Sequence, residues 1–428
     1  MKWIPRFFLL LFAISFQQCE DTCVTENTYV YLKPVYSTSA EIKAAVGFDA
    51  PQDIHQAGKI YFYENYLFIN EIGEGIHLID NRIPASPKPL GFLTIPGNLD
   101  LVIQNDLLYA DSYIDLVVFD ISNLSLIKEV NRIERLFEAY NSFGFYSDPL
   151  KGVVTDWEKV ENVTVQRGTC NSQIQSWGGI YIDDGIGLTA GAFSNFKTMG
   201  GSAQTATQGI GGSMARFTLA GNYLYALDGS NMEILNLANG KSPEVKKEIE
   251  ISWDVETLFP HEEKLFMGAR SGMYIYDLEV PESPKLLSQY AHVQSCDPVV
   301  VEGDYAYVTL RNGNTCQGFV NQLEVINIKD VKAPMLVNTY AMTNPHGLAI
   351  DNGLLFICDG TDGLKVFDAK DVKTISEHQL VNYKEINALD VIAFNNVAMM
   401  ISSDGLYQYD YSDIKNIKFL SKLAIIKL

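Results

Sequence analysis

A hydrophobic stretch of three residues recurs seven times along the chain, and each copy has the character of a β-strand. The copies usually follow turn residues such as Asn, Asp or Gly. They begin at Tyr66, Leu107, Tyr223, Lys264, Tyr305, Leu354 and Val397, at spacings of 41, 116, 41, 41, 49 and 43 residues. A period of about 40 to 50 residues is typical of β-propeller blades. The five spacings of 41 to 49 residues therefore predict one repeated unit, and the spacing of 116 residues predicts an insertion.

Each unit is expected to hold four strands. After the triplet strand comes a strand of alternating pattern that ends in Asp or Asn, at residues 76–80, 116–120, 232–236, 273–277, 323–327, 364–368 and 406–410. This short polar side chain can accept hydrogen bonds from downstream amides and so start the next turn. A further β-rich stretch precedes each triplet strand, as at 348–350. The fourth strand of the unit follows the turn, as at 335–340.

These units predict an all-β chain that forms a seven-bladed β-propeller over residues 56–428, because radial closure hides the sheet edges. The alternative, a linear solenoid, needs polar capping repeats, and neither end copy is more polar than its neighbours. Residues 136–212 are expected to form a long Gly-, Ser- and Gln-rich loop with aromatic residues between blades 2 and 3. Two segments compete for the last outer strand, 417–426 and 42–46.

Two of these strands resemble a known repeat. Leu116-Val117-Val118-Phe119-Asp120 and Leu323-Glu324-Val325-Ile326-Asn327 are similar to the repeat that names the LVIVD-repeat family of bacterial surface propellers, and the resemblance covers about residues 59–410. The resemblance implies an exported propeller without an assigned activity.

The N-terminus is typical of an export signal. Lys2 and Arg6 precede an apolar run at 7–16 that is too short to span a bilayer as a helix. Cys19, followed by Glu20 and Asp21, stands where a bacterial lipoprotein carries its lipid, although Gln18 replaces the usual small residue before it. We expect a lipoprotein signal peptide at 1–18, a tether and N-terminal segment at 19–55, and an outer-membrane or cell-surface location. Plain secretion is the alternative.

The net charge narrows the choice of partners. The chain of 428 residues carries 52 acidic and 32 basic residues, and a net charge of −20 repels phosphate backbones and anionic lipid headgroups. We therefore expect a protein or glycan partner at the cell surface, no nucleic acid, and membrane attachment only through the lipid anchor.

Ionisable residues gather at one edge of the predicted sheets. In each unit the first strand begins at the edge where the second strand ends, and we call this edge the rim. Residues just before the first strands are Lys59, Asp100, Arg216, Glu256, Asp297, His346 and Asp390. Residues just after the second strands are Glu71, Asp111, Asp228, Arg270, Arg311, Asp359 and Asp404. Such a concavity suits a polar, anionic or sugar-like ligand; the alternative is that these charges only pair with each other and solvate the rim.

Two cysteines fall close together on the rim of the fifth blade. Cys296 lies just before its first strand, and Cys316 lies in an insertion at 312–321 that lengthens its rim loop. An oxidising compartment favours a disulfide that closes a loop of about 20 residues and contributes about 3 kcal/mol. The alternative is two reduced thiols, and Cys170 and Cys358 have no partner that the pattern assigns.

The usual motifs of catalysis do not appear in the sequence. No GxSxG elbow, HExxH helix or glycine-rich phosphate loop is present. The stretch Asp359-Gly360-Thr361-Asp362-Gly363 weakly resembles a calcium loop but lacks the later Glu, so we expect no cofactor and leave calcium as the one alternative. The sequence therefore favours a non-enzymatic binding or scaffold module. The alternative is a hydrolase or lyase that acts on a sugar or lactone with rim carboxylates and His346, although a lone turn histidine is more often structural.

Overall fold

The computed structural model describes residues 22–137, 147–148, 150–169, 181–182, 208–292, 298–312 and 320–426, without the side chains of 22–30, 161–169 and 181–182. The chain divides into two compact units, one of residues 1–35 and 156–193 and one of residues 36–155 and 194–428. Among the described residues, no helix combines the length and the hydropathy that crossing a membrane would need.

One sheet combines the start of the chain with the predicted insertion. Its strand order is β11 (Ser147–Asp148), β12 (Gly152–Thr169), β1 (Thr22–Ser37) and β13 (Tyr181–Ile182). β13 runs parallel to β1, whereas β11 is antiparallel to β12. The segment 136–212 is thus more than the loop that the sequence predicted, since its described parts include strands.

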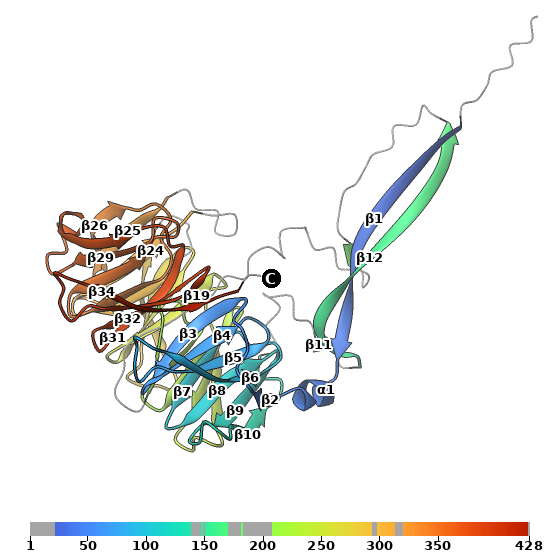
Figure 1. Cartoon of the computed structure of the whole chain (residues 1–428), viewed down its shortest axis with the longest axis horizontal. Helices are drawn as coiled ribbons and strands as arrows, with labels where there is room; N and C mark the ends of the chain where they lie inside the picture. The colour runs from blue at the N-terminus through green and yellow to red at the C-terminus, as the bar shows by residue number, and fades with distance from the viewer. Residues whose placement is uncertain are drawn as a thin grey trace, which may run out of the picture. The chain divides into compact units, whose positions relative to one another are not determined.

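Seven antiparallel sheets make up most of the second unit (Figure 1). The first contains β3 (Ala57–Tyr63), β4 (Tyr66–Glu71), β5 (Gly75–Asp80) and β6 (Lys88–Thr94), with β14 (Ile210–Gly211) added beside β3 and β2 (Gly47–Asp49) beside β6. The other six have four strands each, in chain order: β7 (Leu101–Gln104), β8 (Leu107–Ser112), β9 (Asp115–Asp120), β10 (Lys128–Ile133); β15 (Phe217–Ala220), β16 (Tyr223–Asp228), β17 (Asn231–Asn236), β18 (Glu244–Glu250); β19 (Val255–His261), β20 (Lys264–Ala269), β21 (Gly272–Asp277), β22 (Lys285–Ala291); β23 (Val299–Glu302), β24 (Tyr305–Leu310), β25 (Gln322–Asn327), β26 (Met335–Ala341); β27 (Leu348–Asp351), β28 (Leu354–Cys358), β29 (Leu364–Asp368), β30 (Gln379–Tyr383); β31 (Ala388–Phe394), β32 (Val397–Ser402), β33 (Gly405–Asp410), β34 (Lys418–Ala424). All seven second strands begin at the residue that the hydrophobic triplets predicted.

The Asp or Asn that ends each third strand caps the turn after it, as the sequence predicted. In all seven sheets its Oδ1 accepts a hydrogen bond from the amide two residues on, at 2.8–3.2 Å. The pairing of third and fourth strands shifts register once in every sheet, for example between Leu78 and Ile79. A bulge at the same place in each unit increases the local twist of the outer strand.

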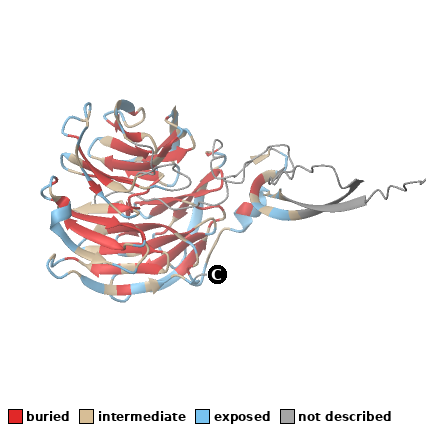
Figure 2. Ribbon diagram, turned by 90° about the horizontal axis from the view of Figure 1, so that it is seen from above, coloured by how far each residue is buried: buried red, intermediate tan, exposed pale blue. Residues whose placement is uncertain are grey.

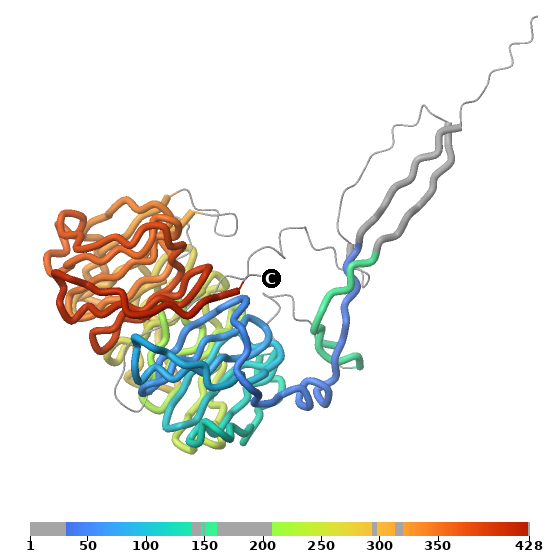
Figure 3. The backbone as a smooth tube through the Cα atoms, in the orientation of Figure 1, coloured from blue at the N-terminus to red at the C-terminus, as the bar shows by residue number. Residues whose placement is uncertain are grey.

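The first strands of the seven sheets contact one another in cyclic order: β3, β7, β15, β19, β23, β27, β31 and again β3. The two ends of this arrangement also meet (Figure 3), since Ile54 forms a parallel bridge with Ile425 and the amide of Ile426 donates to the Ile54 carbonyl at 2.7 Å. The prediction of a last outer strand within 417–426 is confirmed by β34. The competing strand at 42–46 is wrong, because Thr38 caps a helix there, α1 (Ser39–Ala44), through a capping box with Glu41.

The core lies between the faces of neighbouring sheets. Second and third strands are almost wholly buried, whereas fourth strands are largely exposed (Figure 2). One cluster joins the first sheet to the seventh, with Ile60 and Leu67 packed with Ile392 and Met399. Each fully buried side chain of this size contributes about 1.5–3 kcal/mol. Helix α1 adds Ile42 to a small cluster with Tyr113, Ile114 and Val153, and a 3-10 turn, η2 (Ile375–His378), precedes β30.

Candidate functional site

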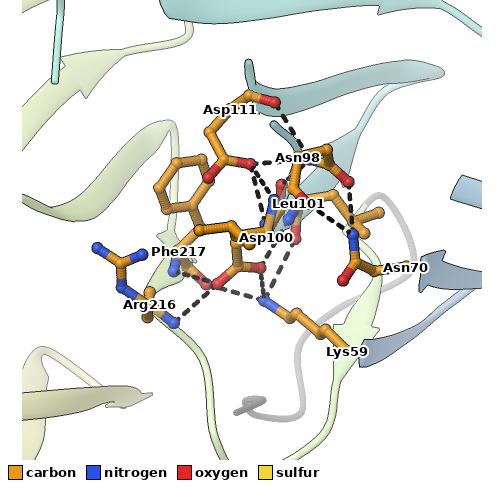
Figure 4. A network of polar contacts seen from close by, with 9 residues as sticks. Lys59, Asn70, Asn98, Asp100, Leu101, Asp111, Arg216 and Phe217 are labelled. Atoms are coloured by element: carbon orange, nitrogen blue, oxygen red, sulfur yellow. Dashed lines mark hydrogen bonds and ion pairs between the residues drawn. The ribbon is translucent and has the colours of Figure 1, made fainter. Parts of the chain in front are cut away.

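Three predicted rim residues, Lys59, Asp100 and Arg216, meet although Arg216 lies 116 residues beyond Asp100 (Figure 4). The Lys59 ammonium donates to Asp100 Oδ1, and both side chains are at most 2% exposed. The other oxygen, Asp100 Oδ2, accepts from the backbone amides of Arg216 at 2.8 Å and Phe217 at 3.0 Å. The cyclic contact of β3, β7 and β15 is what brings these three residues together, because each lies at or just before the start of a first strand.

A second carboxylate extends this network away from Lys59. Asp111 Oδ1 accepts from Asn98 Nδ2 at 2.8 Å and from the amides of Leu99 and Asp100 at 2.7 and 3.0 Å. Asn70 Nδ2 in turn donates to Asn98 Oδ1 at 2.8 Å. Burial raises the pKa of Asp111 to about 6, although the amide hydrogen bonds and the charge of Arg216 oppose that shift.

Arg216 supplies the opposite charge to these two aspartates. Its Nη2 donates to the Leu227 carbonyl at 2.9 Å. Burial lowers the pKa of Arg216 to about 10, against the attraction of Asp111, Asp100 and Asp228. The guanidinium therefore remains charged at neutral pH, and the carboxylates that compensate its charge belong to the same chain.

Asp390 accepts hydrogen bonds from the Ser213 amide at 3.2 Å and from the Ser213 hydroxyl at 3.1 Å, both to Oδ1. Its second oxygen, Oδ2, is buried and has no hydrogen-bond partner among the described residues. Burial raises the pKa of Asp390 to about 7, opposed by its hydrogen bonds and by the charge of Lys59. Two glycines confine the carboxylate: a Cβ at either Gly212 or Gly347 would lie 2.0 Å from one of its oxygens.

Ser213 belongs to residues 208–216, which lead from the end of the insertion to β15 and which we call the crossing segment. This segment bonds to first strands of several sheets: β14 pairs with β3, Gly209 N donates to the Ile103 carbonyl of β7 at 3.0 Å, and Leu258 N of β19 donates to the Ala215 carbonyl at 2.7 Å. The Ser213 hydroxyl also accepts from the Leu348 amide of β27 at 2.7 Å. Groups of the first strands of five sheets thus bond to the crossing segment. These are the first, second, fourth, sixth and seventh sheets.

Other predicted rim residues are also tied to nearby groups. Asp359 is fully buried, accepts from the amides of Thr343 and Asn344 at 3.0 and 2.7 Å, and pairs with Lys365. Lys365 also pairs with Asp362 at 2.6 Å, so the stretch that resembled a calcium loop uses both carboxylates for one lysine. No cluster of three or more metal-ligating side chains occurs in the described ranges.

His346 lies in the same turn region. It is 3% exposed, its Nε2 lies 3.2 Å from Asn344 Nδ2, and its amide donates to the Cys358 carbonyl at 2.7 Å. Cys358 is a buried free thiol whose pKa burial raises well above the usual value. The role of His346 as a base or ligand remains a prediction, and a substrate would reach its imidazole only after the local packing opened.

In the fourth sheet two predicted rim residues pair with each other and are partly exposed to solvent. Arg270 Nε donates to Glu256 Oε1 at 2.7 Å, and the two side chains are 33% and 16% exposed. Arg311, directly after β24, is half-buried. Asp297, Cys19 and the predicted disulfide partners Cys296 and Cys316 lie outside the described residues.

Sequence reasoning missed two groups of polar residues. Asn70 and Asn98 connect the carboxylates, and Ser213 holds Asp390. Asn98 lies two residues before the predicted rim residue Asp100, so the alignment of the repeats could have indicated it. Ser213 carried no such signal, because its partners lie more than 130 residues away in the chain.

The comparison with known protein families agrees with the repeat pattern. The LVIVD repeat model matches residues 100–134 and 295–316, which confirms the resemblance. No curated protein matches the chain.

Solved structures with a similar backbone have low sequence identity to this chain. The computationally designed Ika8 protein aligns with a TM-score of 0.50 and 10% identity, over 89% of this chain and 93% of its own. The dihydro-heme d1 dehydrogenase NirN in complex with DHE aligns with a TM-score of 0.49 and 11% identity, over 92% of this chain and 75% of its own. Sqt1 of Saccharomyces cerevisiae aligns with a TM-score of 0.46 and 9% identity, over 94% and 89%. At such identities the likeness concerns the fold alone.

Proposed function

We propose that this chain, an LVIVD-repeat protein, is an exported surface lipoprotein whose seven sheets close into a seven-bladed β-propeller with the inserted segment between blades 2 and 3. It acts as a non-enzymatic binding or scaffold module for a polar ligand or a protein partner at the rim. Its partners at the cell surface are proteins or glycans, and it reaches the membrane only through a lipid on Cys19.

The cyclic contacts of the first strands support the ring. Each of the seven contacts two others, and β3 contacts β31, so no first strand is left at an end. The bridge between Ile54 and Ile425 adds a second link between the first and last sheets. Closure of this kind protects sheet edges without the capping repeats of a solenoid.

The division of the rim charges into buried and exposed groups supports a binding role and carries this proposal. The buried groups, centred on Lys59, Asp100 and Asp390, hold first strands and the crossing segment together. They therefore build a rigid frame. Glu256 and Arg270 stand on the same rim and stay within reach of solvent. A fixed frame that presents a few polar groups is the usual arrangement of a binding surface.

The proposal is tested by titrating panels of glycans and peptides onto the purified protein by isothermal calorimetry. Binding is expected, and Glu256→Gln with Arg270→Gln should weaken it at least tenfold. Lys329→Gln is the matched control, because Lys329 lies at the opposite edge, after a third strand, and is 77% exposed. Binding that survives the double rim substitution would contradict the proposal, and so would the absence of any binding.

A further inference from the structure

One tryptophan of the fourth sheet is held on the rim with its ring in solvent. Trp253 is 71% exposed, whereas Trp157, the other tryptophan whose side chain is described, is half-buried. Trp253 lies in the short connection from β18 to the first strand β19, next to the Glu256–Arg270 pair. An exposed apolar residue needs no explanation by itself, so its surroundings decide whether it forms a site.

The connection that carries Trp253 is rigid. The neighbouring Asp254 is 4% exposed, and its carboxylate accepts from the Ser252 hydroxyl and, at 2.9 Å, from the Ser271 amide. The Asp254 carbonyl accepts from the Arg270 amide at 3.1 Å. These bonds join the two turns of the sheet at the rim and fix the position of the turn that carries the indole. Binding of a ligand to the indole therefore costs little conformational entropy of the protein.

The groups around the indole are polar and complementary to a sugar. The Arg270 guanidinium lies 5.9 Å from the Trp253 ring centroid and is tied to Glu256 Oε1. Within the described part of the chain, the second Glu256 oxygen and the indole N–H make no hydrogen bond. The site therefore offers an aromatic face, one acceptor and one donor within a few residues. A pyranose ring matches this set, because its C–H face packs on an aromatic face and its hydroxyls both donate and accept.

A protein partner fits this set less well. Hot spots on protein interfaces are anchors within a ring of residues that exclude water, whereas the described residues that hydrogen-bond in the turns beside Trp253 are polar: Ser252, Asp254, Glu256, Arg270 and Ser271. Charge then selects among sugars. The chain carries −20, and the Arg270 charge is already compensated by Glu256, so an anionic sugar would meet repulsion.

We propose that Trp253, Glu256 and Arg270 form a subsite for one neutral pyranose ring of a glycan. This inference rests on the proposed binding function and adds to it the class of ligand and the stacking residue. The other face of the indole packs against the sugar ring, and Glu256 accepts hydrogen bonds from its hydroxyls.

The test is calorimetric titration of the full-length protein with cellohexaose, xylohexaose and maltohexaose, with a trigalacturonic acid titration as the anionic comparison. The expected result is binding of at least one neutral oligosaccharide, quenching of tryptophan fluorescence, and no measurable binding of the acid. Trp253→Ala should weaken binding at least tenfold, Trp253→Phe by a smaller factor, and Glu256→Gln severalfold. Melting temperatures should stay unchanged, because the indole is exposed.

Phe419→Ala is the matched control. Phe419 is an exposed aromatic residue of another sheet, 56% exposed, on the outer strand β34, and its loss should leave sugar binding unchanged. Equal binding by Trp253→Ala and wild type would overturn the inference, as would preference for the acid or failure of all three neutral sugars. If a peptide binds instead and is lost on the Glu256→Gln, Arg270→Gln substitution, this inference fails while the proposed binding function stands.

Discussion

Asp390 accepts two hydrogen bonds from Ser213, a residue that precedes it by 177 positions and lies directly after the insertion, before the first strand of the third sheet. The same serine hydroxyl accepts from the Leu348 amide, so one side chain connects the crossing segment to two sheets. The segment that leads from the insertion into β15 is thus bonded to the first strands of several sheets.

Ser213→Ala is expected to destabilise the protein by about 1–3 kcal/mol. It removes a donor from the buried Asp390 carboxylate and leaves the Leu348 amide without its acceptor. Chemical denaturation followed by tyrosine and tryptophan fluorescence measures the change. Ser125→Ala, at an exposed turn, should change stability by less than about 0.5 kcal/mol; similar losses in the two variants would contradict this role of Ser213.

The buried ion pair gives a second prediction. Lys59→Met leaves the Asp100 carboxylate buried without its cation and should cost about 3–5 kcal/mol. The double variant Lys59→Met, Asp100→Asn should recover part of that loss, because the uncompensated charge is gone. Lys329→Met removes the exposed partner of Asp304 at 4.0 Å and should cost less than about 1 kcal/mol. A Lys59→Met protein as stable as wild type would refute a structural role for the pair.

The raised pKa of Asp390 predicts a specific pH dependence of stability. Its pKa is about 7 in the folded chain against an ordinary value of 3.8, so between these values the folded state binds the extra proton. Stability from this group is therefore greatest at low pH and is lost as pH rises from about 4 to about 7. Between pH 5 and pH 8 the stability of Asp390→Asn should fall less than that of wild type, by about 2–3 kcal/mol, and denaturation at the two pH values measures this difference.

Asp304→Asn is the control for that comparison, because Asp304 is exposed at 57%. Its pH dependence should follow the wild type. If Asp390→Asn also follows the wild type, the Asp390 carboxyl does not hold a proton at neutral pH.

The architecture was largely predictable from the sequence, whereas the interior of the site was not. The starts of β4, β8 and β16 follow from local hydrophobic triplets, because each strand carries its own pattern and turn residues. Alignment by repeats also brought Lys59, Asp100 and Arg216 to one rim. Helix α1 was missed because its apolar residue Ile42 fits either element and the capping box at Thr38 was not used. The crossing segment was missed because its pairing depends on distant strands and on glycines such as Gly212, which leave room for Asp390.

The export proposal predicts that Cys19 carries the lipid. Expression in a bacterial host with a labelled fatty acid should label the wild type, and Cys19→Ser should remove the label and release the protein from the membrane fraction. Cys358→Ser should keep the label, because Cys358 is buried within β28. Equal labelling of wild type and Cys19→Ser would exclude lipidation at Cys19.

Ring closure underlies every statement about the rim, and an engineered disulfide between Ile54 and Ile425 tests it most directly. The two residues form a parallel bridge between the ends of the chain's repeats, so oxidised Ile54→Cys, Ile425→Cys protein should contain this cross-link by peptide mapping. The oxidised protein should also be more stable by up to about 5 kcal/mol, since the closed loop is long. Ile54→Cys, Leu126→Cys is the control pair and should remain reduced. Cross-linking of the control pair, or none between positions 54 and 425, would show that the ends do not meet and would contradict the closed ring.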